Sequence, residues 1–409
     1  MEVVEKGYIL VEDGRIIDKG PGAAPSDLNI NRINAEGMIV APSFINMHTH
    51  IGDSVAKEAG IGLSVTELVA PPDGLKHRIL RSTPDAELMS AMRDTMLDML
   101  SSGTTTFADF RENGLRGVEL LLHAARDLPI RPFICGRPDK LPCFTNAEFE
   151  ANQKQLPKVV AEETENILKI ADAISCSIGN DLTDPAMEQM AAISTRLGKM
   201  RAIHVAERGT KHPRTGMSDV ERVVKYYRPN FVVHMTNASD DDIDTIARNR
   251  IPVVCCPRAN ARLGEGVPPI KKMIESGITL TLGTDNVMLN SPDLFREMEY
   301  VSKFMKGLEK DPKFLHPREV LKMVTINAAR ALALDKDVGS IDKDKLANLV
   351  FIDSRDRNLK PVLDPIASIV HRATPENVKA IMVRGKLLRK KERISRELQL
   401  ASRSSLSMR

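Results

Sequence analysis

The chain has 409 residues, of which 42% are hydrophobic and 28% charged, and its formal net charge is +3. These values are typical of an ordinary globular protein and give no reason to expect nucleic acid or a membrane surface as a partner. No run of about eighteen apolar residues occurs, so no membrane-spanning helix is expected. The N-terminal stretch alternates like a strand and has no cleavage site, so we expect no signal peptide.

The chain has five cysteines, which form no spaced framework of the kind that disulfide-rich proteins show. Two of them, Cys255 and Cys256, are adjacent within an apolar run, and we interpret them as buried strand residues. A reducing, cytoplasmic setting is therefore expected.

Both ends of the chain show hairpin patterns. Residues 1–42 contain "GYILVEDGRIIDKG", which predicts two strands with a turn at Asp13 and Gly14. Residues 339–390 contain "LANLVFIDSRD" and "VKAIMVRGKLLRK", which read in the same way. Neither segment could build a core alone, so we expect both to form one small composite β-sandwich domain. The charged, Ser-rich tail 391–409 is expected to be a frayed helix or disordered.

Residues 43–338 alternate short apolar runs with longer amphipathic stretches. In "TPDAELMSAMRDTMLDML", for example, Leu88, Met92, Met96 and Met99 recur at helical spacing. Eight alternations of a buried strand and a helix predict an α/β fold, a parallel (β/α)8 TIM barrel. The predicted strands are 38–50, 103–110, 130–138, 173–180, 200–207, 231–236, 251–258 and 279–286.

Histidines and acids collect at the ends of these predicted strands. The stretch "FINMHTH" places His48 and His50 on one face of a strand, because successive side chains alternate. Other strand ends carry His204 with Glu207, His234, and Asp285. In such barrels the chemistry lies at the C-terminal ends of the strands, so this collection predicts a metal site. By contrast, His77, His123, His212 and His371 fall in helices and loops. For His77 the alternatives are contact with the substrate and a place on the surface, and we expect the second.

With these residues in place, the chain resembles the amidohydrolase superfamily, and within it the metal-dependent deaminase and chlorohydrolase-like branch. Cytosine, guanine and S-adenosylhomocysteine deaminases are of this type. The resemblance covers nearly the whole chain and includes "GTTTFAD", "CCPRANARLGEGVPPIKKMIESGITLTLGTDN", "LKMVTINAARALAL" and "VGSIDKDKLANLVFID".

The resemblance implies that His48, His50, His204 and Asp285 bind one divalent metal ion, zinc or iron. Glu207 would then be the proton shuttle, and His234 would orient the attacking water or the substrate. The residue types suit these roles, because a cation held by imidazoles and a carboxylate makes hydroxide available near neutral pH. Asp285 can accept the proton of the attacking water, and Glu207 can protonate a ring nitrogen and then the departing amine.

One absence favours a single metal ion. Binuclear members carry a carboxylated lysine or a glutamate at the end of the fourth strand, whereas "AISCSIGND" offers neither. Lys169 falls before that strand, in a helical stretch. The deaminases built on H-x-E and P-C-x-x-C are also excluded, because "LPCFTN" lacks the second cysteine.

Arginines also follow predicted strands, namely Arg111, Arg137 and Arg258, and the loop after the fifth strand adds Lys211 and Arg214. Any one of them is as readily a solvated or ion-paired surface residue. Together they favour a substrate with an acidic group, because guanidinium groups bind carboxylates and phosphates in a forked geometry. Asp109 is interpreted either as support for the site or as an ion-pair partner of Arg111.

The leading hypothesis is thus a mononuclear aminohydrolase that releases ammonia from a heterocycle such as a purine, pyrimidine or pterin-like base or nucleoside. The alternatives are hydrolytic opening of a ring C–N bond, as in an imidazolonepropionase-like enzyme, and dehalogenation. A non-catalytic scaffold is the remote alternative, because such relatives typically lose metal ligands. The long loop 51–82 is either a substrate wall or a subunit contact. We expect a small-molecule substrate, no nucleic acid or membrane partner, and a homo-oligomer.

Overall fold

The computed structural model describes residues 2–25 and 31–389. The predicted tail 391–409 lies outside the described residues. The chain divides into two units, and each is described by itself. One comprises Met1–Ile45, Leu97–Thr105 and Asp293–Arg409, and the other comprises Asn46–Met96 and Thr106–Pro292. The predicted boundaries at 42, 338 and 390 stay predictions.

A parallel sheet forms the larger architecture, in the order β11-β10-β9-β8-β7-β6-β5-β4-β12. Its two outermost members are halves of one predicted strand, separated only by Gly283 and Thr284. Because β12 pairs with β4 while β11 pairs with β10, the last strand joins the first and the sheet closes. Two hydrogen bonds of Asn46 stabilise this closure: its side chain donates to Thr284 Oγ1 at 2.8 Å and accepts from Thr284 N at 3.1 Å. The predicted (β/α)8 barrel is confirmed.

The strands of this sheet follow the predicted runs closely, and parallel pairing explains why they are buried on both faces. They are β4 (Phe44–His50), β5 (Thr104–Arg111), β6 (Arg131–Gly136), β7 (Ala173–Ile178), β8 (Met200–Val205), β9 (Phe231–His234), β10 (Val253–Cys255), β11 (Leu280–Leu282) and β12 (Asp285–Asn286).

Two predicted strands are broken in the structure, which corrects the prediction. The run 38–50 becomes two strands in different sheets, because the chain leaves the antiparallel sheet at Ser43, whose N–H donates to Asn348 O. The run 279–286 breaks at Gly283, where a Cβ atom would lie 2.6 Å from the Cβ of His48. Only glycine allows this approach of the two backbones.

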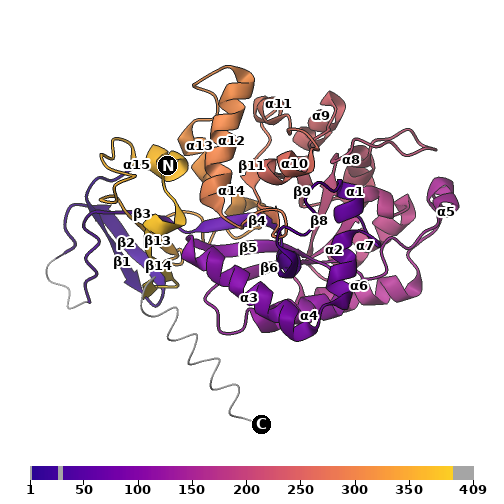
Figure 1. Ribbon diagram of the computed structural model, residues 1–409, viewed down its shortest axis with the longest axis horizontal. Helices are drawn as coiled ribbons and strands as arrows, with labels where there is room; N and C mark the ends of the chain where they lie inside the picture. The colour runs from indigo at the N-terminus through magenta and orange to yellow at the C-terminus, as the bar shows by residue number, and fades with distance from the viewer. Residues whose placement is uncertain (1, 26–30, 390–409) are drawn as a thin grey trace, which may run out of the picture. The chain divides into compact units, whose positions relative to one another are not determined.

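Helices connect the barrel strands, and those between β5 and β9 include α4, α6 and α7 (Figure 1). Helix α3 contains the predicted apolar stripe, and its four members from Leu88 to Met99 are at most 2% exposed. The helices are α1 (Val65–Leu68), α2 (Leu75–Ser82), α3 (Asp85–Ser101), α4 (Gly114–Ala124), α5 (Asn146–Ala151), α6 (Lys158–Ile170), α7 (Asp184–Arg196), α8 (Asp219–Arg222), α9 (Asp240–Arg248), α10 (Pro257–Leu263), α11 (Ile270–Glu275), α12 (Leu294–Glu309), α13 (Pro317–Met323), α14 (Ile326–Ala331) and α15 (Pro365–His371). Single turns occur at η1 (Ile51–Ala56), η2 (Gly179–Asp181), η3 (Val223–Tyr227) and η4 (Pro375–Asn377).

Two antiparallel sheets assemble from both ends of the chain, as predicted. One is the hairpin of β1 (Gly7–Glu12) and β2 (Arg15–Pro21), whose turn residues Asp13 and Gly14 have positive φ. The other has the order β15-β14-β13-β3. Ile16 of the hairpin packs against Leu349 and Phe351 of the second sheet. The strands of this second sheet are β3 (Met38–Pro42), β13 (Leu349–Asp353), β14 (Val378–Val383) and β15 (Lys386–Arg389).

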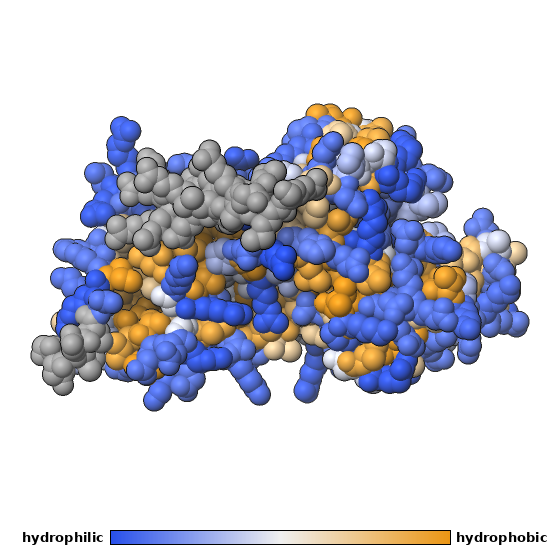
Figure 2. All heavy atoms as spheres, turned by 90° about the horizontal axis from the view of Figure 1, so that it is seen from below, coloured by the Kyte–Doolittle hydropathy of each residue, from blue (hydrophilic) through white to orange (hydrophobic). Residues whose placement is uncertain are grey.

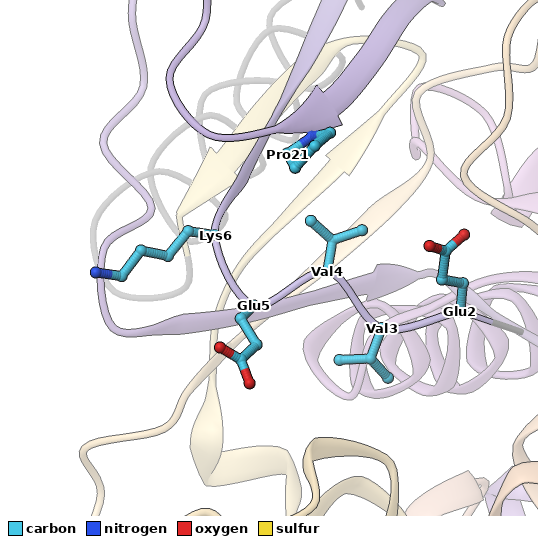
Figure 3. Close-up of a pocket in the computed structure, with 6 residues that line it drawn as sticks. All are labelled: Glu2, Val3, Val4, Glu5, Lys6 and Pro21. Atoms are coloured by element: carbon cyan, nitrogen blue, oxygen red, sulfur yellow. The ribbon is translucent and has the colours of Figure 1, made fainter.

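On the face seen in Figure 2, hydrophobic areas are visible between hydrophilic side chains. Within the described residues, no helix is long and apolar enough to cross a membrane. A pocket of about 440 Å³ lies beside the start of β1, lined by Glu2 to Lys6 and by Pro21 (Figure 3). Its valines Val3 and Val4 are 42% and 50% exposed, so the pocket is open to solvent, and none of its lining residues is a histidine.

Alanine substitutions at two glycines should change the free energy of unfolding in opposite directions. Gly283→Ala should lower the free energy of unfolding by about 1–3 kcal/mol, because the added methyl group must displace the backbone of His48. Gly307→Ala, in the exposed part of α12 with open space around it, should instead raise it by about 0.5–1 kcal/mol. Urea unfolding of both variants measures this, and a neutral Gly283→Ala would contradict the close approach.

Candidate active site

Imidazoles and a carboxylate meet at the C-terminal ends of the barrel strands. His48 and His50 lie at the end of β4, and His204 is the penultimate residue of β8. His234 ends β9 and Asp285 begins β12. The Nε2 atoms of His48 and His204 are 3.3 Å apart, and Oδ1 of Asp285 lies 3.1 Å from His48 Nε2 and 3.6 Å from His50 Nε2. The structure thus brings together residues that are far apart in the sequence, with 237 positions between His48 and Asp285.

Two of the imidazoles are oriented by backbone carbonyls of neighbouring strands. Nδ1 of His50 lies 2.9 Å from Phe110 O, and Nδ1 of His204 lies 2.6 Å from Ser177 O. A carbonyl can only accept, so each ring carries its proton on Nδ1 and turns the lone pair of Nε2 inward. Nε2 of these rings is therefore available as a ligand atom.

His234 has the opposite arrangement. The amide nitrogen of Asn260 faces Nδ1 of His234 at 3.2 Å and donates to it. The proton of the neutral ring then lies on Nε2, which makes this atom a hydrogen-bond donor toward the centre. Nε2 of His234 lies 3.7 Å from Oε1 of Glu207. This geometry distinguishes His234 from the rings whose Nε2 is unprotonated.

Burial makes the electrostatics of the cluster unusual. Burial lowers the pKa of His48 to about 3, so its ring is neutral at physiological pH. Burial also holds the pKa of His204 well below its usual range, with help from the neighbouring histidines. For Asp285, burial alone would raise the pKa, but the hydrogen bond with His48 and the histidine charges outweigh it, and the pKa lies below the usual range. An ionised carboxylate, 3% exposed, thus lies beside the neutral imidazole of His48.

This donor set fits a divalent cation. The ligand atoms of His48, His50 and His204 all lie within 4.8 Å of one another, and so do those of His48, His234 and Asp285. Imidazole nitrogens with one carboxylate oxygen suit Zn²⁺ or Fe²⁺. A buried carboxylate beside the neutral ring of His48 is also stabilised by a positive charge, which a cation supplies.

Glu207 lies just beyond the end of β8, and its side chain is 14% exposed. The preceding residue, Ala206, has φ of +48°, a left-handed conformation that is costly for alanine. Asp219 holds this turn, because its Oδ2 accepts from Ala206 N at 2.8 Å. Asn237 N donates to Ala206 O at 2.7 Å, and its side-chain amide donates to Glu207 O. The backbone that presents Glu207 is therefore fixed from two sides.

Three charged residues near His50 were missed by the sequence analysis. Glu112 lies 2.7 Å from His50 Nδ1, Lys76 lies 2.7 Å from the same Glu112 oxygen, and Asp53 accepts from Asn286 Nδ2 at 2.7 Å. All are less than 5% exposed. The only signal in the sequence is that Glu112 follows Arg111, and that Lys76 lies in a loop already expected to be functional. A charged residue in a loop is normally solvated, so its burial could not be foreseen.

The predicted arginines are placed differently from one another. Arg111 is 2% exposed, and its guanidinium is engaged by Asp109 and Glu112. Arg137 is also buried, and it donates to Leu141 O. Arg258 is half-buried and lies 3.5 Å from Ser291 O. Their roles in substrate binding stay predictions.

Other expectations are answered by the same contacts. Asp109 forms the ion pair with Arg111 and also supports the chain next to His50, because it accepts a hydrogen bond from Ile51 N at 2.7 Å. The expectation that His77 lies on the surface is wrong, because it is 7% exposed and its Nε2 lies 3.1 Å from Val69 O. In the loop after β8, Lys211 and Arg214 are exposed.

The sequence of residues 39–388 matches the amidohydrolase family over most of the chain. This chain belongs to the amidohydrolase family. A relative from Methanothermobacter thermautotrophicus, named as an inferred aminohydrolase, is 37% identical over 407 residues, which cover 95% of this chain and 100% of that protein. The 5-methylthioadenosine/S-adenosylhomocysteine deaminase of Moorella thermoacetica is 27% identical, with 94% and 90% covered.

Solved structures agree in fold. A zinc-bound adenosine deaminase from Xanthomonas campestris has a TM-score of 0.78 at 18% identity, covering 98% of this chain and 93% of that chain. The zinc complex of atrazine chlorohydrolase from Arthrobacter aurescens has a TM-score of 0.79 at 18% identity, covering 96% and 93%. The predicted deaminase and chlorohydrolase-like branch is thus confirmed, and the chain is a deaminase-like hydrolase of C–N bonds with a histidine metal site.

The turn before Glu207 predicts a pH effect on stability. Burial, with the nearby charge of Asp242, raises the pKa of Asp219 from 3.8 to about 6. A raised folded-state pKa means that the contribution of Asp219 is fully present below about pH 4 and is lost as the pH rises through about 6. Asp219→Asn cannot ionise and can still accept from Ala206 N. Its stability relative to the wild type should therefore increase between pH 4.5 and 7, by about 2 kcal/mol.

Urea unfolding at both pH values measures this difference. Asp241→Asn, at an exposed position of α9, is the matched control and should show no such change. A constant difference between wild type and Asp219→Asn across this range would mean that Asp219 is not protonated there.

Proposed function

We propose that this amidohydrolase is a mononuclear aminohydrolase that releases ammonia from an amino-substituted heterocycle. The observation that carries the proposal is the buried, ionised Asp285 carboxylate beside the imidazoles of His48 and His50, with Glu207 Oε1 3.7 Å from His234 Nε2. His48, His50, His204 and Asp285 would hold one zinc or iron ion. A divalent cation held there supplies the Lewis acidity that makes hydroxide available near neutral pH.

The residues of the chain then divide the proton transfers. Asp285 accepts the proton of the attacking water, since Oδ1 faces the centre at 3.1 Å from His48 Nε2. Glu207 protonates a ring nitrogen of the substrate and then the departing amine. His234 keeps Nε2–H directed at the centre and orients the water or the substrate, which explains why Asn260 holds its other nitrogen.

Two observations support one metal ion rather than two. The residues at the end of β7, Gly179 to Asp181, supply neither lysine nor glutamate. Lys169 lies in the last turn of α6, where its Nζ donates to Asn166 Oδ1. Neither places a bridging ligand beside the histidines.

Deamination is favoured over ring opening or dehalogenation by the relatives of this chain. The deaminase of Moorella thermoacetica matches along almost the whole chain, and it is named for 5-methylthioadenosine and S-adenosylhomocysteine. We therefore propose a purine-like or related amino-heterocycle as the substrate. A homo-oligomer and a reducing, cytoplasmic setting are part of the same proposal, the latter because the five cysteines form no spaced framework in the sequence.

Glu207→Gln provides the first test. The variant keeps the shape of the side chain but cannot shuttle a proton, so ammonia release should fall by about 10²–10⁴-fold. Zinc content should stay at one ion per protomer in both proteins. Ammonia release is measured with zinc-loaded protein across acidic and neutral amino-heterocycles, with Glu275→Gln, on the exposed side of α11, as the control.

Each outcome of this test is informative. Undiminished release by Glu207→Gln would remove Glu207 from the mechanism. Metal-loaded wild type that releases no ammonia from any compound would favour ring-opening hydrolysis. Two tightly held ions per protomer would contradict the mononuclear assignment.

The acidic group of the substrate is tested through the arginines. If Arg137 or Arg258 binds such a group, Arg137→Ala or Arg258→Ala should raise KM for an acidic substrate at least about tenfold more than for its neutral analogue. Arg196→Ala, an exposed arginine paired with Glu165, is the control. Equal effects on both substrates would show that neither arginine recognises a charge.

A further inference from the structure

We propose that Lys76 is a positioning residue of the metal site, which acts through Glu112 on His50. The proposal rests on the proposed function, because it requires His50 to be a metal ligand. It adds a residue from the loop 51–82 to the site, although Lys76 touches neither the cluster of ligand atoms nor, on this geometry, the reacting atoms.

A single oxygen links the three side chains. Glu112 Oε1 lies 2.7 Å from Lys76 Nζ and 2.7 Å from His50 Nδ1. Lys76 is 4% exposed, Glu112 3% and His50 6%. Because water is excluded from all three, the ammonium group fixes the position of the very oxygen that faces His50 Nδ1.

The other oxygen of Glu112 is held as well. Arg111 binds Oε2 of Glu112 and also lies 3.3 Å from Asp109 Oδ1. Asp109 Oδ2 in turn accepts from Ile51 N at 2.7 Å and from Thr49 Oγ1 at 3.1 Å. Thr49 and Ile51 flank His50 in the chain, so the network holds His50 by its ring and by its neighbours.

The direction of the His50 ring follows from this network. Both Phe110 O and Glu112 Oε1 face Nδ1, so the ring keeps its proton there and turns Nε2 toward Asp285, 3.6 Å away. A carboxylate behind a metal-binding histidine fixes its orientation and raises its basicity. Without a counter-charge, however, a buried Glu112 would be costly, and Lys76 supplies that charge together with Arg111.

A purely structural ion pair would not require this sharing of one oxygen. Lys76 is carried by α2, two residues after Gly74 begins the turn into that helix, and its ammonium extends to β5 rather than to solvent. Burying an ammonium group is expensive, and lysine is rarely found buried unless it is paired. The loop 51–82 is therefore anchored at the carboxylate that orients His50, so its placement and that of His50 are coupled.

The experiment measures zinc affinity, by competition with a chelator, in Lys76→Met, Glu112→Leu and the double variant. Each single variant should bind zinc about 10–100-fold more weakly than the wild type. Lys76→Met in the Glu112→Leu background should cause no further loss, because Lys76 acts only through Glu112. Lys199→Met is the matched control, since Lys199 also donates to a partly buried carbonyl, Ala171 O, but precedes β8 at the other end of that strand.

Several outcomes would overturn the proposal. Circular dichroism and urea unfolding show whether Lys76→Met is folded. A folded Lys76→Met variant that binds zinc as tightly as the wild type would contradict a role of Lys76 in the metal site. Losses that multiply in the double variant show that Lys76 does not act through Glu112. If a single variant does not fold, the double variant removes both charges together, and wild-type zinc affinity in it contradicts the proposal.

The proposal and the proposed function fail in different ways. Wild-type protein that binds no zinc contradicts both. Wild-type protein that binds zinc and releases ammonia, while Lys76→Met retains full zinc affinity, contradicts only the role of Lys76.

Discussion

The burial of the Asp285 carboxylate is the constraint on which the site depends. An ionised carboxylate is stable away from water only beside positive charge or several donors. Its neighbours His48 and His50 lie 3.1 and 3.6 Å away through Nε2, and burial keeps His48 neutral. A cation is the simplest partner that satisfies both the carboxylate of Asp285 and the imidazole lone pairs.

The barrel supplies the orientation that this constraint requires. At the C-terminal end of a parallel strand, the last carbonyls no longer all pair with the next strand, so they can accept from side chains. Phe110 O and Ser177 O use this freedom to bind the rings of His50 and His204 from behind. The same strand ends that gather the histidines thus also decide which nitrogen of each ring faces inward. Closure through Asn46 and Thr284 places Asp285 in register with Thr49. The Asp285 carboxylate therefore lies beside the Nε2 atoms of His48 and His50.

Much of this could be predicted because it depends on local pattern. Strand periodicity placed His48 and His50 on one face, and the turn at Asp13 and Gly14 was evident from the residue types. The positions of Glu112 and Lys76 could not be predicted, since they are 36 residues apart in sequence and charged residues in loops are normally solvated. His77 was misplaced for the same reason. The break at Gly283 depends on contact with β4, which no local signal encodes.

The charges behind the site bear on what the substrate can carry. Asp53, Asp109 and Glu112 face Lys76 and Arg111 in one buried network, three acids against two cations. Burial raises the pKa of Asp53 to about 6, which reduces the excess but does not reverse it. The guanidinium of Arg111 is therefore engaged by acids of the protein. We accordingly favour Arg137 and Arg258 over Arg111 as the residues that would bind an acidic group of the substrate. The metal site and its supporting network can then stay the same while those cations set the specificity, which is how one fold serves many reactions.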